Sequence, residues 1–301
     1  MHEWFRSYLT NRQQFTCVAG ARSSSKSITC GVAQGSVLGP LLFLIYVNDI
    51  ENAVPNEIIK LFADDTNLFV FGESFSIVNQ KANECLNELY MWFIANKLSL
   101  NLTKTCYMVF KAKYDDNVEL FCGQRVIQKV NKCHYLGVVI DNELKWTLHI
   151  EQLYCKLIKF TSIFYKLRTK LPERILKQLY FAFVHSRIMF GIELYANTCS
   201  TYLDKLIKLN NKLLRILQNR PLLVPTRELY LKYNTLPINE LHEQQLLIFV
   251  HKFVFHPDLL PPVFIRNNYF VFNDQVHQYN VRTKKDLYNH SCNSIRLVRV
   301  M

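Results

Sequence analysis

Two short apolar segments flank a pair of aspartates within residues 60–71. Both segments are rich in Phe, Leu and Val, a composition that favours strands over helices. Asp64 and Asp65 stand where a tight turn would join the two strands, because aspartate tolerates turn dihedrals. The run therefore predicts a β-hairpin that holds two carboxylates at one edge of a sheet.

Paired carboxylates in this position suit a hard divalent cation. Proteins bind Mg²⁺ through one or two carboxylates together with substrate phosphates. Asp64 and Asp65 are therefore candidate metal ligands. The alternative is a surface hairpin with an acidic turn and no ligand, and the pair alone leaves both interpretations open.

The positive charge of the 301-residue chain is confined to one half. Residues 1–150 hold 14 Lys and Arg against 14 Asp and Glu, whereas residues 151–301 hold 22 against 10, which accounts for the net charge of +12. The length and a hydrophobic content of 50% predict a folded protein of two domains. The uneven charge suggests two tasks, and the basic half suggests a polyanionic partner.

Cysteine usage and the N-terminal sequence bear on the compartment. The nine Cys include no C-x-x-C pair, and the first residues contain no signal-peptide core. We therefore expect an intracellular protein of the nucleus or cytoplasm that is not secreted. The most apolar run, residues 37–47, is too short to span a bilayer and contains Pro40, so we expect no membrane association.

A glycine-rich segment, residues 31–40, precedes a short apolar run. Its glycines let the backbone approach a ligand closely, and Gln34 next to Gly35 supplies an amide that both donates and accepts hydrogen bonds. Residues 41–47 should form a helix that is apolar nearly all round and therefore buried. The segment is a candidate nucleotide contact, and the alternative is an ordinary loop that leads into a core helix.

The remainder of the first half alternates between one helix and several strands. Apolar residues at three- and four-residue steps predict a helix over 76–95, and Lys104 lies in the connection to the next strand. Taken alone, that lysine could equally be a solvated loop residue. The strands are predicted over 106–110, 118–122, 125–127 and 134–140.

The second half has a helical period. One predicted helix, residues 202–219, places four cations within about 80° of each other and its leucines on the opposite side. Such a row neutralises successive phosphates and makes binding salt-dependent, whereas the alternative is a merely soluble surface. The cations are Lys205, Lys208, Lys212 and Arg215. Further helices are predicted over 148–170, 172–190 and 239–255, followed from Arg266 by a polar, poorly patterned tail.

Several blocks, in this order, resemble the reverse transcriptases of non-LTR retrotransposons of the jockey-like kind. The resemblance covers roughly residues 4–150, and the helical region after them resembles the family's thumb. The blocks are GVAQGSVLGPLLF at residues 31–43, YVND at 46–49, FADD at 62–65, the segment 92–105 that ends in NLTKT, and YLG at 135–137.

The resemblance implies an α+β fold in three parts. Residues 1–145 would form a partial polymerase palm, an antiparallel sheet with packed helices. Residues 146–225 would form a basic, all-α, thumb-like region, and residues 226–301 a C-terminal helical segment and polar tail. The implied function is an RNA-directed DNA polymerase that transfers nucleotides with two Mg²⁺ or Mn²⁺ ions. Its partners would be an RNA template, a DNA primer and deoxynucleoside triphosphates, and the oligomeric state is left open.

The family's motifs also imply roles for individual residues. Asp64 and Asp65 match its paired metal-binding aspartates, and Lys104 matches a lysine near the triphosphate, a candidate proton donor to the departing pyrophosphate. The remaining matches are Gln34 and Gly35, which would lie against the incoming nucleotide and template, and Tyr135, Leu136 and Gly137, which would grip the primer end.

Two departures from the family pattern stand out. Ala33 occupies a position where the family usually has Pro. The family's first metal-binding Asp and its fingers precede the block that matches residues 4–12, so we expect an N-terminally truncated polymerase fragment that does not extend a primer by itself. The alternative is a non-catalytic nucleic-acid-binding module that uses the basic helices after residue 150.

Overall fold

The computed structural model of the chain describes residues 1–110, 119–259 and 296–300. It divides into two compact units, Met1–Val130 with Ile295–Met301, and Asn131–Ser294. Each unit has its own buried apolar cluster. The fold is mixed α and β, as predicted, whereas the functional boundary at residue 145 stays a prediction.

The first unit is built on a six-stranded sheet with the order β5-β6-β12-β7-β9-β8. Neighbouring strands run antiparallel except β7 and β9, which are parallel. The strands predicted over 106–110, 118–122 and 125–127 are present, with residue 118 outside the described part. The strands are β5 (Ile58–Phe62), β6 (Asp65–Gly72), β7 (Cys106–Val109), β8 (Leu120–Cys122), β9 (Arg125–Lys129) and β12 (Arg296–Val300).

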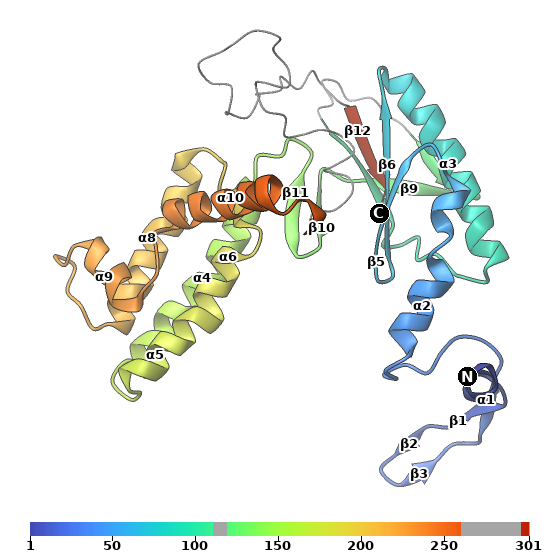
Figure 1. Cartoon of the computed structure of the whole chain (residues 1–301), viewed down its shortest axis with the longest axis horizontal. Helices are drawn as coiled ribbons and strands as arrows, with labels where there is room; N and C mark the ends of the chain where they lie inside the picture. The colour runs from blue at the N-terminus through green and yellow to red at the C-terminus, as the bar shows by residue number, and fades with distance from the viewer. Residues whose placement is uncertain (111–118, 260–295, 301) are drawn as a thin grey trace. The chain divides into compact units, whose positions relative to one another are not determined.

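Helix α3 (Phe75–Ala95) covers one face of this sheet (Figure 1). Its first turn is capped by the Ser74 hydroxyl, which accepts the Ile77 N–H at 3.3 Å. The buried side of the helix packs against alternate strand residues such as Leu68 and Val70, which forms the core of the unit. The helix predicted over 76–95 is therefore confirmed. Its buried residues are Val78, Ala82, Cys85, Leu86 and Leu89.

Helix α2 corrects the expectation of a buried apolar helix. It spans Gly39–Val47, and only its two terminal residues are buried. Leu41, Leu44, Ile45 and Tyr46 are each about half exposed or more. An apolar sequence determines what a helix could bury, but burial also needs a second layer, and the described part of the unit provides none around the middle of α2.

The N-terminal part combines helix α1 (His2–Leu9) with a long hairpin. The tip of this hairpin is at Ala19–Gly20, because the strand pairing extends as far as Val18 and Ala21. The 3-10 helix η1 (Ile50–Ala53) joins α2 to the sheet. The strands are β1 (Arg12–Gln14), β2 (Cys17–Val18), β3 (Ala21–Arg22) and β4 (Lys26–Ile28).

The C-terminal strand β12 lies in the interior of the sheet, between β6 and β7. The tail from Arg266 onward is polar and poorly patterned in sequence, and residues 266–295 of it lie outside the described residues. At 296–300 the tail forms a strand, which its weak sequence pattern does not predict. A five-residue strand with two neighbours has its backbone hydrogen bonds satisfied by pairing, so it needs no long apolar run of its own.

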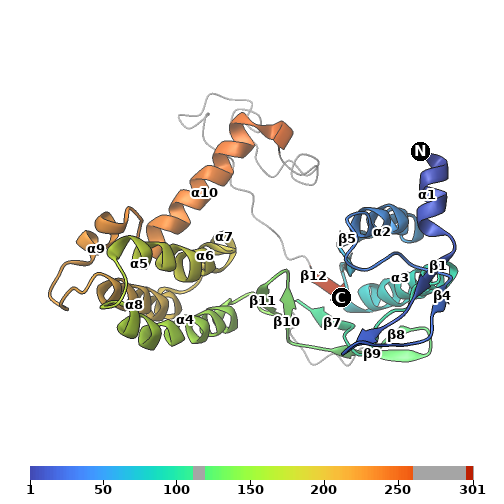
Figure 2. The same cartoon turned by 90° about the horizontal axis from the view of Figure 1, so that it is seen from below.

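Over its described residues, the second unit is a helical bundle with one β-hairpin, β10 (Lys132–Tyr135) and β11 (Val138–Asp141). Helices α4 and α8 lie alongside each other (Figure 2), and the Thr198 hydroxyl donates to the Lys145 carbonyl at 2.9 Å just before the two helices begin. The four predicted helices are confirmed to within three residues at each end. They are α4 (Thr147–Leu167), the run of α5 (Glu173–Tyr180), η2 (Phe181–His185) and α6 (Ser186–Met189), then α8 (Ser200–Leu217) and α10 (Ile238–Phe255).

Two further helices of the bundle were not predicted. Helix α7 (Ile192–Tyr195) has one turn, and α9 (Thr226–Tyr233) has only two, so neither shows a long periodic pattern. Both contribute buried side chains to the bundle core, among them Tyr195 and Tyr233. None of the described helices of either unit combines the length and apolarity that crossing a lipid bilayer requires.

Candidate functional site

The paired aspartates lie at the tip of the β5–β6 hairpin, as predicted. Phe62 pairs with Asp65, so the turn consists of Ala63 and Asp64. Ala63 has φ +53°, a left-handed conformation that costs an ordinary residue about 1 kcal/mol. Both aspartates are exposed. The tight turn therefore fixes two adjacent carboxylates at the sheet edge and leaves them open to a ligand.

Lys104 lies at the same edge of the sheet. Leu68, Val300 and Tyr107 form one row across β6, β12 and β7. Asp65 precedes Leu68 by three residues, and Lys104 precedes Tyr107 by three, so both lie on the same side of that row. Two strand spacings separate the starts of β6 and β7 by roughly 10 Å. Lys104 is exposed in a turn that its N–H closes on the Asn101 carbonyl at 3.0 Å.

The carboxylate pair fits a metal that keeps water or phosphate among its ligands. None of the ion pairs of the described residues uses Asp64 or Asp65. Across the same residues no group of three or more His, Cys, Asp or Glu side chains could enclose a metal ion. Two exposed carboxylates with free oxygens match partial coordination of Mg²⁺, whose remaining ligands come from phosphates and water.

The glycine-rich segment is an exposed loop that leads into α2. Its turn is closed by Ser36, whose hydroxyl donates to the Ala33 carbonyl at 2.7 Å and accepts the Gly39 N–H at 3.0 Å. Gly35 has φ +80°, and a Cβ there would meet no atom within 4 Å, so its backbone conformation rather than crowding requires glycine. Gln34 and Gly35 both face solvent.

The motif Tyr135–Gly137 lies in a hairpin turn, and the prediction of one strand over 134–140 is wrong. Tyr135 pairs with Val138, which leaves Leu136 and Gly137 as a two-residue turn. Their φ values, +46° and +87°, are the two positive values that a type I′ turn requires. Glycine accepts this conformation readily, whereas a leucine is strained by about 1 kcal/mol or more.

His149 fixes this hairpin to the bundle. Its Nδ1 accepts the Val139 N–H at 3.2 Å, and its ring lies 5.0 Å from that of Tyr195, centroid to centroid. The side chain is buried, and burial lowers its pKa. The pKa of His185, in η2, is lowered by burial as well. Burial therefore favours the neutral form of both imidazoles.

We expect the thermal stability of the chain to fall as the pH drops below about 6.5. The pKa of His149 is lower in the folded chain than its ordinary value of 6.5. As the pH falls through 6.5, the unfolded chain therefore binds more protons than the folded chain, and the free energy of unfolding decreases. Melting curves at about pH 7.5 and 5.5 should show a smaller loss in His149→Gln and in His185→Gln than in the unmodified chain. In the double variant, most of the difference in melting temperature between the two pH values should disappear. A difference as large as that of the unmodified chain would show that the two histidines do not cause it.

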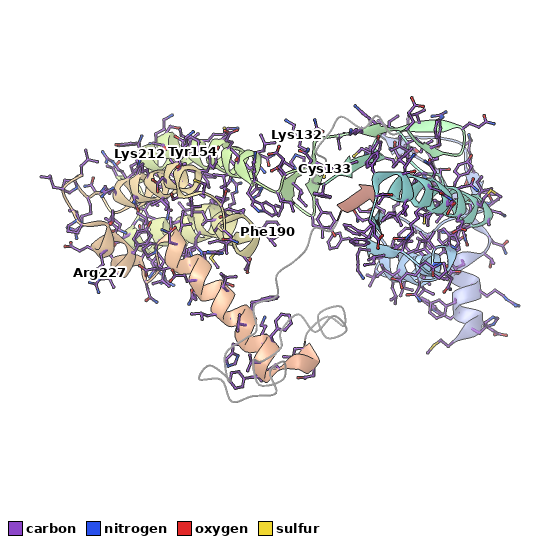
Figure 3. The ribbon with its side chains drawn as sticks, turned by 90° about the horizontal axis from the view of Figure 1, so that it is seen from above. Lys132, Cys133, Tyr154, Phe190, Lys212 and Arg227 are labelled. Atoms are coloured by element: carbon purple, nitrogen blue, oxygen red, sulfur yellow. The ribbon has the colours of Figure 1, made fainter. Side chains whose placement is uncertain are left out.

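The predicted row of cations on α8 is present in part. Lys205, Lys208 and Lys212 are exposed, and Figure 3 shows Lys212 on the same side of the α4–α8 pair as Tyr154 of α4. Arg215 departs from the expectation because it is half-buried, and its guanidinium donates to the Val224 carbonyl at 3.4 Å. We call the three exposed lysines the lysine row.

Two buried polar residues that support the bundle were not predicted. Asp141 accepts the N–H groups of Glu143, Lys145 and Trp146 at 3.0 to 3.2 Å and so shapes the entry to α4. Asn210 lies inside the bundle beneath the lysine row and bonds to tyrosines of α5 and α9. A polar residue among the leucines of a predicted helix was the only sequence sign of Asn210.

The first part of the chain matches a known protein family in sequence. Residues 1–140 match the family model of the reverse transcriptase (RNA-dependent DNA polymerase). The RNA-directed DNA polymerase from mobile element jockey of Drosophila melanogaster is 25% identical over 234 residues, and its Drosophila funebris counterpart is 26% identical over 239. These alignments cover 74% and 76% of the chain.

A more distant relative extends the comparison. The probable RNA-directed DNA polymerase from transposon X-element of Drosophila melanogaster is 22% identical over 219 residues, or 70% of the chain and 24% of that protein. No solved structure matches. The chain spans about a quarter of the length of the jockey polymerases it matches, 26% in both cases. Residues 1–140 therefore match the reverse transcriptase family, and the chain is similar to polymerases of jockey-like, non-LTR retrotransposons.

Proposed function

We propose that the chain carries part of the nucleotidyl-transfer centre of an RNA-directed DNA polymerase. The observation that supports this most directly is the tight turn that holds Asp64 and Asp65 at a sheet edge shared with Lys104. Phosphoryl transfer depends mainly on positioning and on charge stabilisation. Fixed carboxylates, a nearby ammonium group and a basic helical surface are the parts that such a reaction needs.

In this proposal Asp64 and Asp65 hold Mg²⁺ or Mn²⁺. Bound divalent ions would neutralise triphosphate charge and lower the pKa of the attacking hydroxyl group. The chain itself orients the reactants. Lys104 places its ammonium group near the triphosphate and donates a proton to the departing pyrophosphate, while Gln34 and Gly35 lie against the incoming deoxynucleotide and the template.

The second unit would bind the nucleic acid that is copied and extended. We assign the Tyr135–Gly137 turn to the end of the DNA primer. The lysine row would lie along phosphates of the RNA–DNA hybrid, because its three ammonium groups follow one side of a helix. Arg215 supports the loop at Val224 instead of contacting phosphate.

Nucleotide binding tests the carboxylate pair. We expect the chain to bind a deoxynucleoside triphosphate in the presence of Mg²⁺. The affinity should fall at least about tenfold in EDTA, which removes the metal, and equally in the Asp64→Asn/Asp65→Asn variant, which lacks the metal ligands. Titration calorimetry measures both. Glu73→Gln is the matched control, since Glu73 is an exposed carboxylate just beyond the opposite end of β6. Equal affinity in the aspartate variant and the control would refute the metal site.

A non-catalytic nucleic-acid-binding module is the second candidate. The exposed lysine row favours it independently of the aspartates. Such a module would bind an RNA–DNA hybrid equally well in Mg²⁺ and in EDTA, and would bind no nucleotide under either condition. Metal-dependent nucleotide binding that disappears in the aspartate variant would exclude it.

A further inference from the structure

The β10–β11 turn rests on the ring of Phe190. Gly137 has no side chain, and a Cβ there would lie 2.9 Å from Cε1 and 3.2 Å from Cζ of Phe190. Phe190 directly follows α6 and is 55% exposed (Figure 3). The backbone of the turn therefore approaches the ring more closely than any other residue type at position 137 would allow.

Burial of its own side chain does not account for the strained conformation of the turn. Leu136 has φ +46° and is 40% exposed, so its side chain is not buried in the core. A strained residue persists where its surroundings over-determine it, and such residues cluster at functional sites. The close neighbour of this turn is Phe190, whose ring lies against Gly137.

The residues on both sides of this contact are fixed as well. Gly191 has φ +69°, and a Cβ there would lie 3.3 Å from Cγ2 of Val138. The next residue, Val139, donates its N–H to His149. Contacts thus run without interruption along residues 137–139 of the hairpin, against the break between α6 and α7 and against α4. This arrangement ties the position of the turn to the bundle that carries the lysine row.

We propose that Phe190 is a positioning residue for the Tyr135–Gly137 turn, and through it for the terminal nucleotide of the bound primer strand. The inference rests on the proposed function, which assigns this turn to the primer end. Phe190 acts on the turn and not on the reacting atoms. Without its ring the strained turn would relax, and the primer terminus would be held less rigidly while the phosphate contacts of the lysine row remained.

The experiment uses the whole chain and an RNA template annealed to a DNA primer. The primer carries 2-aminopurine either at its 3′ end or at an internal position, so that fluorescence reports local order, while anisotropy reports total binding. Phe190→Ala should lose at least about two thirds of the fluorescence change at the 3′ end, because the support of the turn is gone. The internal signal and the dissociation constant should change by less than about twofold.

Three further variants make this result specific. Phe190→Leu keeps apolar bulk without a ring and should also lose the terminal signal, whereas Phe190→Tyr keeps the ring and should retain it. Phe183→Ala is the matched control, since Phe183 is 44% exposed in the same helical run but stacks on Phe160 at 5.8 Å. It should retain the signal.

The outcomes separate the two proposals. An unchanged terminal signal in both Phe190→Ala and Phe190→Leu would overturn the role of Phe190 and leave the proposed function standing. Equal losses at the terminal and internal positions would also overturn it, because they would indicate a general loss of binding. Failure of the unmodified chain to bind the hybrid at all would instead refute the proposed nucleic-acid function, and the role of Phe190 with it.

Discussion

Replacing Lys208 and Lys212 with glutamate is expected to weaken binding of an RNA–DNA hybrid by about a hundredfold at low salt. Both ammonium groups are exposed, and no ion pair of the described residues uses them. Each phosphate contact contributes about 0.9 to the slope of log affinity against log salt, so the slope should fall by roughly two units. Anisotropy titrations across a salt series measure both quantities.

A matched control separates this local effect from net charge. Arg227→Glu with Lys252→Glu makes the same change in charge within the same unit, on α9 and α10. This control should weaken binding by less than about fivefold, because Arg227 and Lys252 lie on other helices than the lysine row and would contact no phosphate that the row neutralises. If both double variants weakened binding equally, the basic surface would be diffuse and the lysine row would have no special role.

The helices of the second half could be predicted because their cause is local. Residues 202–219 were expected to be helical, and α8 spans Ser200–Leu217, since leucines at three- and four-residue steps encode both the helix and its buried side. The same reasoning missed α9, whose two turns are too short for a periodic pattern. It also included Arg215 in the exposed row, because a helical projection does not reveal the neighbouring loop at Val224.

The features that the sequence did not reveal depend on non-local contacts. The Asp64–Asp65 turn joins adjacent strands, so its position could be predicted from a few residues. The shared edge of Asp65 and Lys104 depends on β12, a strand from the end of the chain that pairs with both β6 and β7. The exposure of α2 likewise depends on what the rest of the fold places beside it, which its apolar sequence does not state.

The second large effect concerns the core beneath the lysine row. Asn210 is fully buried in α8, where its Oδ1 accepts the Tyr180 hydroxyl at 3.2 Å and its Nδ2 donates to the Tyr230 hydroxyl at 3.2 Å. Tyr230 in turn donates to Oδ1 of Asn211 at 2.6 Å. Burial raises the pKa of Tyr230 to about 12, so the network stays neutral at physiological pH. It joins α5, α8 and α9 through one amide.

Asn210→Leu should therefore destabilise the chain by about 3 kcal/mol, because it removes two buried hydrogen bonds and leaves the buried Tyr180 hydroxyl without its acceptor. The melting temperature should fall by about 8 °C, read from thermal unfolding followed by circular dichroism. Gln178→Leu, at an exposed amide on α5, is the matched control and should change stability by less than about 0.5 kcal/mol.

A double-mutant cycle tests whether the destabilisation comes from the unpaired Tyr180 hydroxyl or from poor packing of the leucine side chain. Tyr180→Phe removes the hydroxyl that Asn210 accepts. Combined with Asn210→Leu, it should cost at least about 1 kcal/mol less than the sum of the two single changes, since the group left unpaired is no longer present. Strict additivity would assign the loss to packing alone.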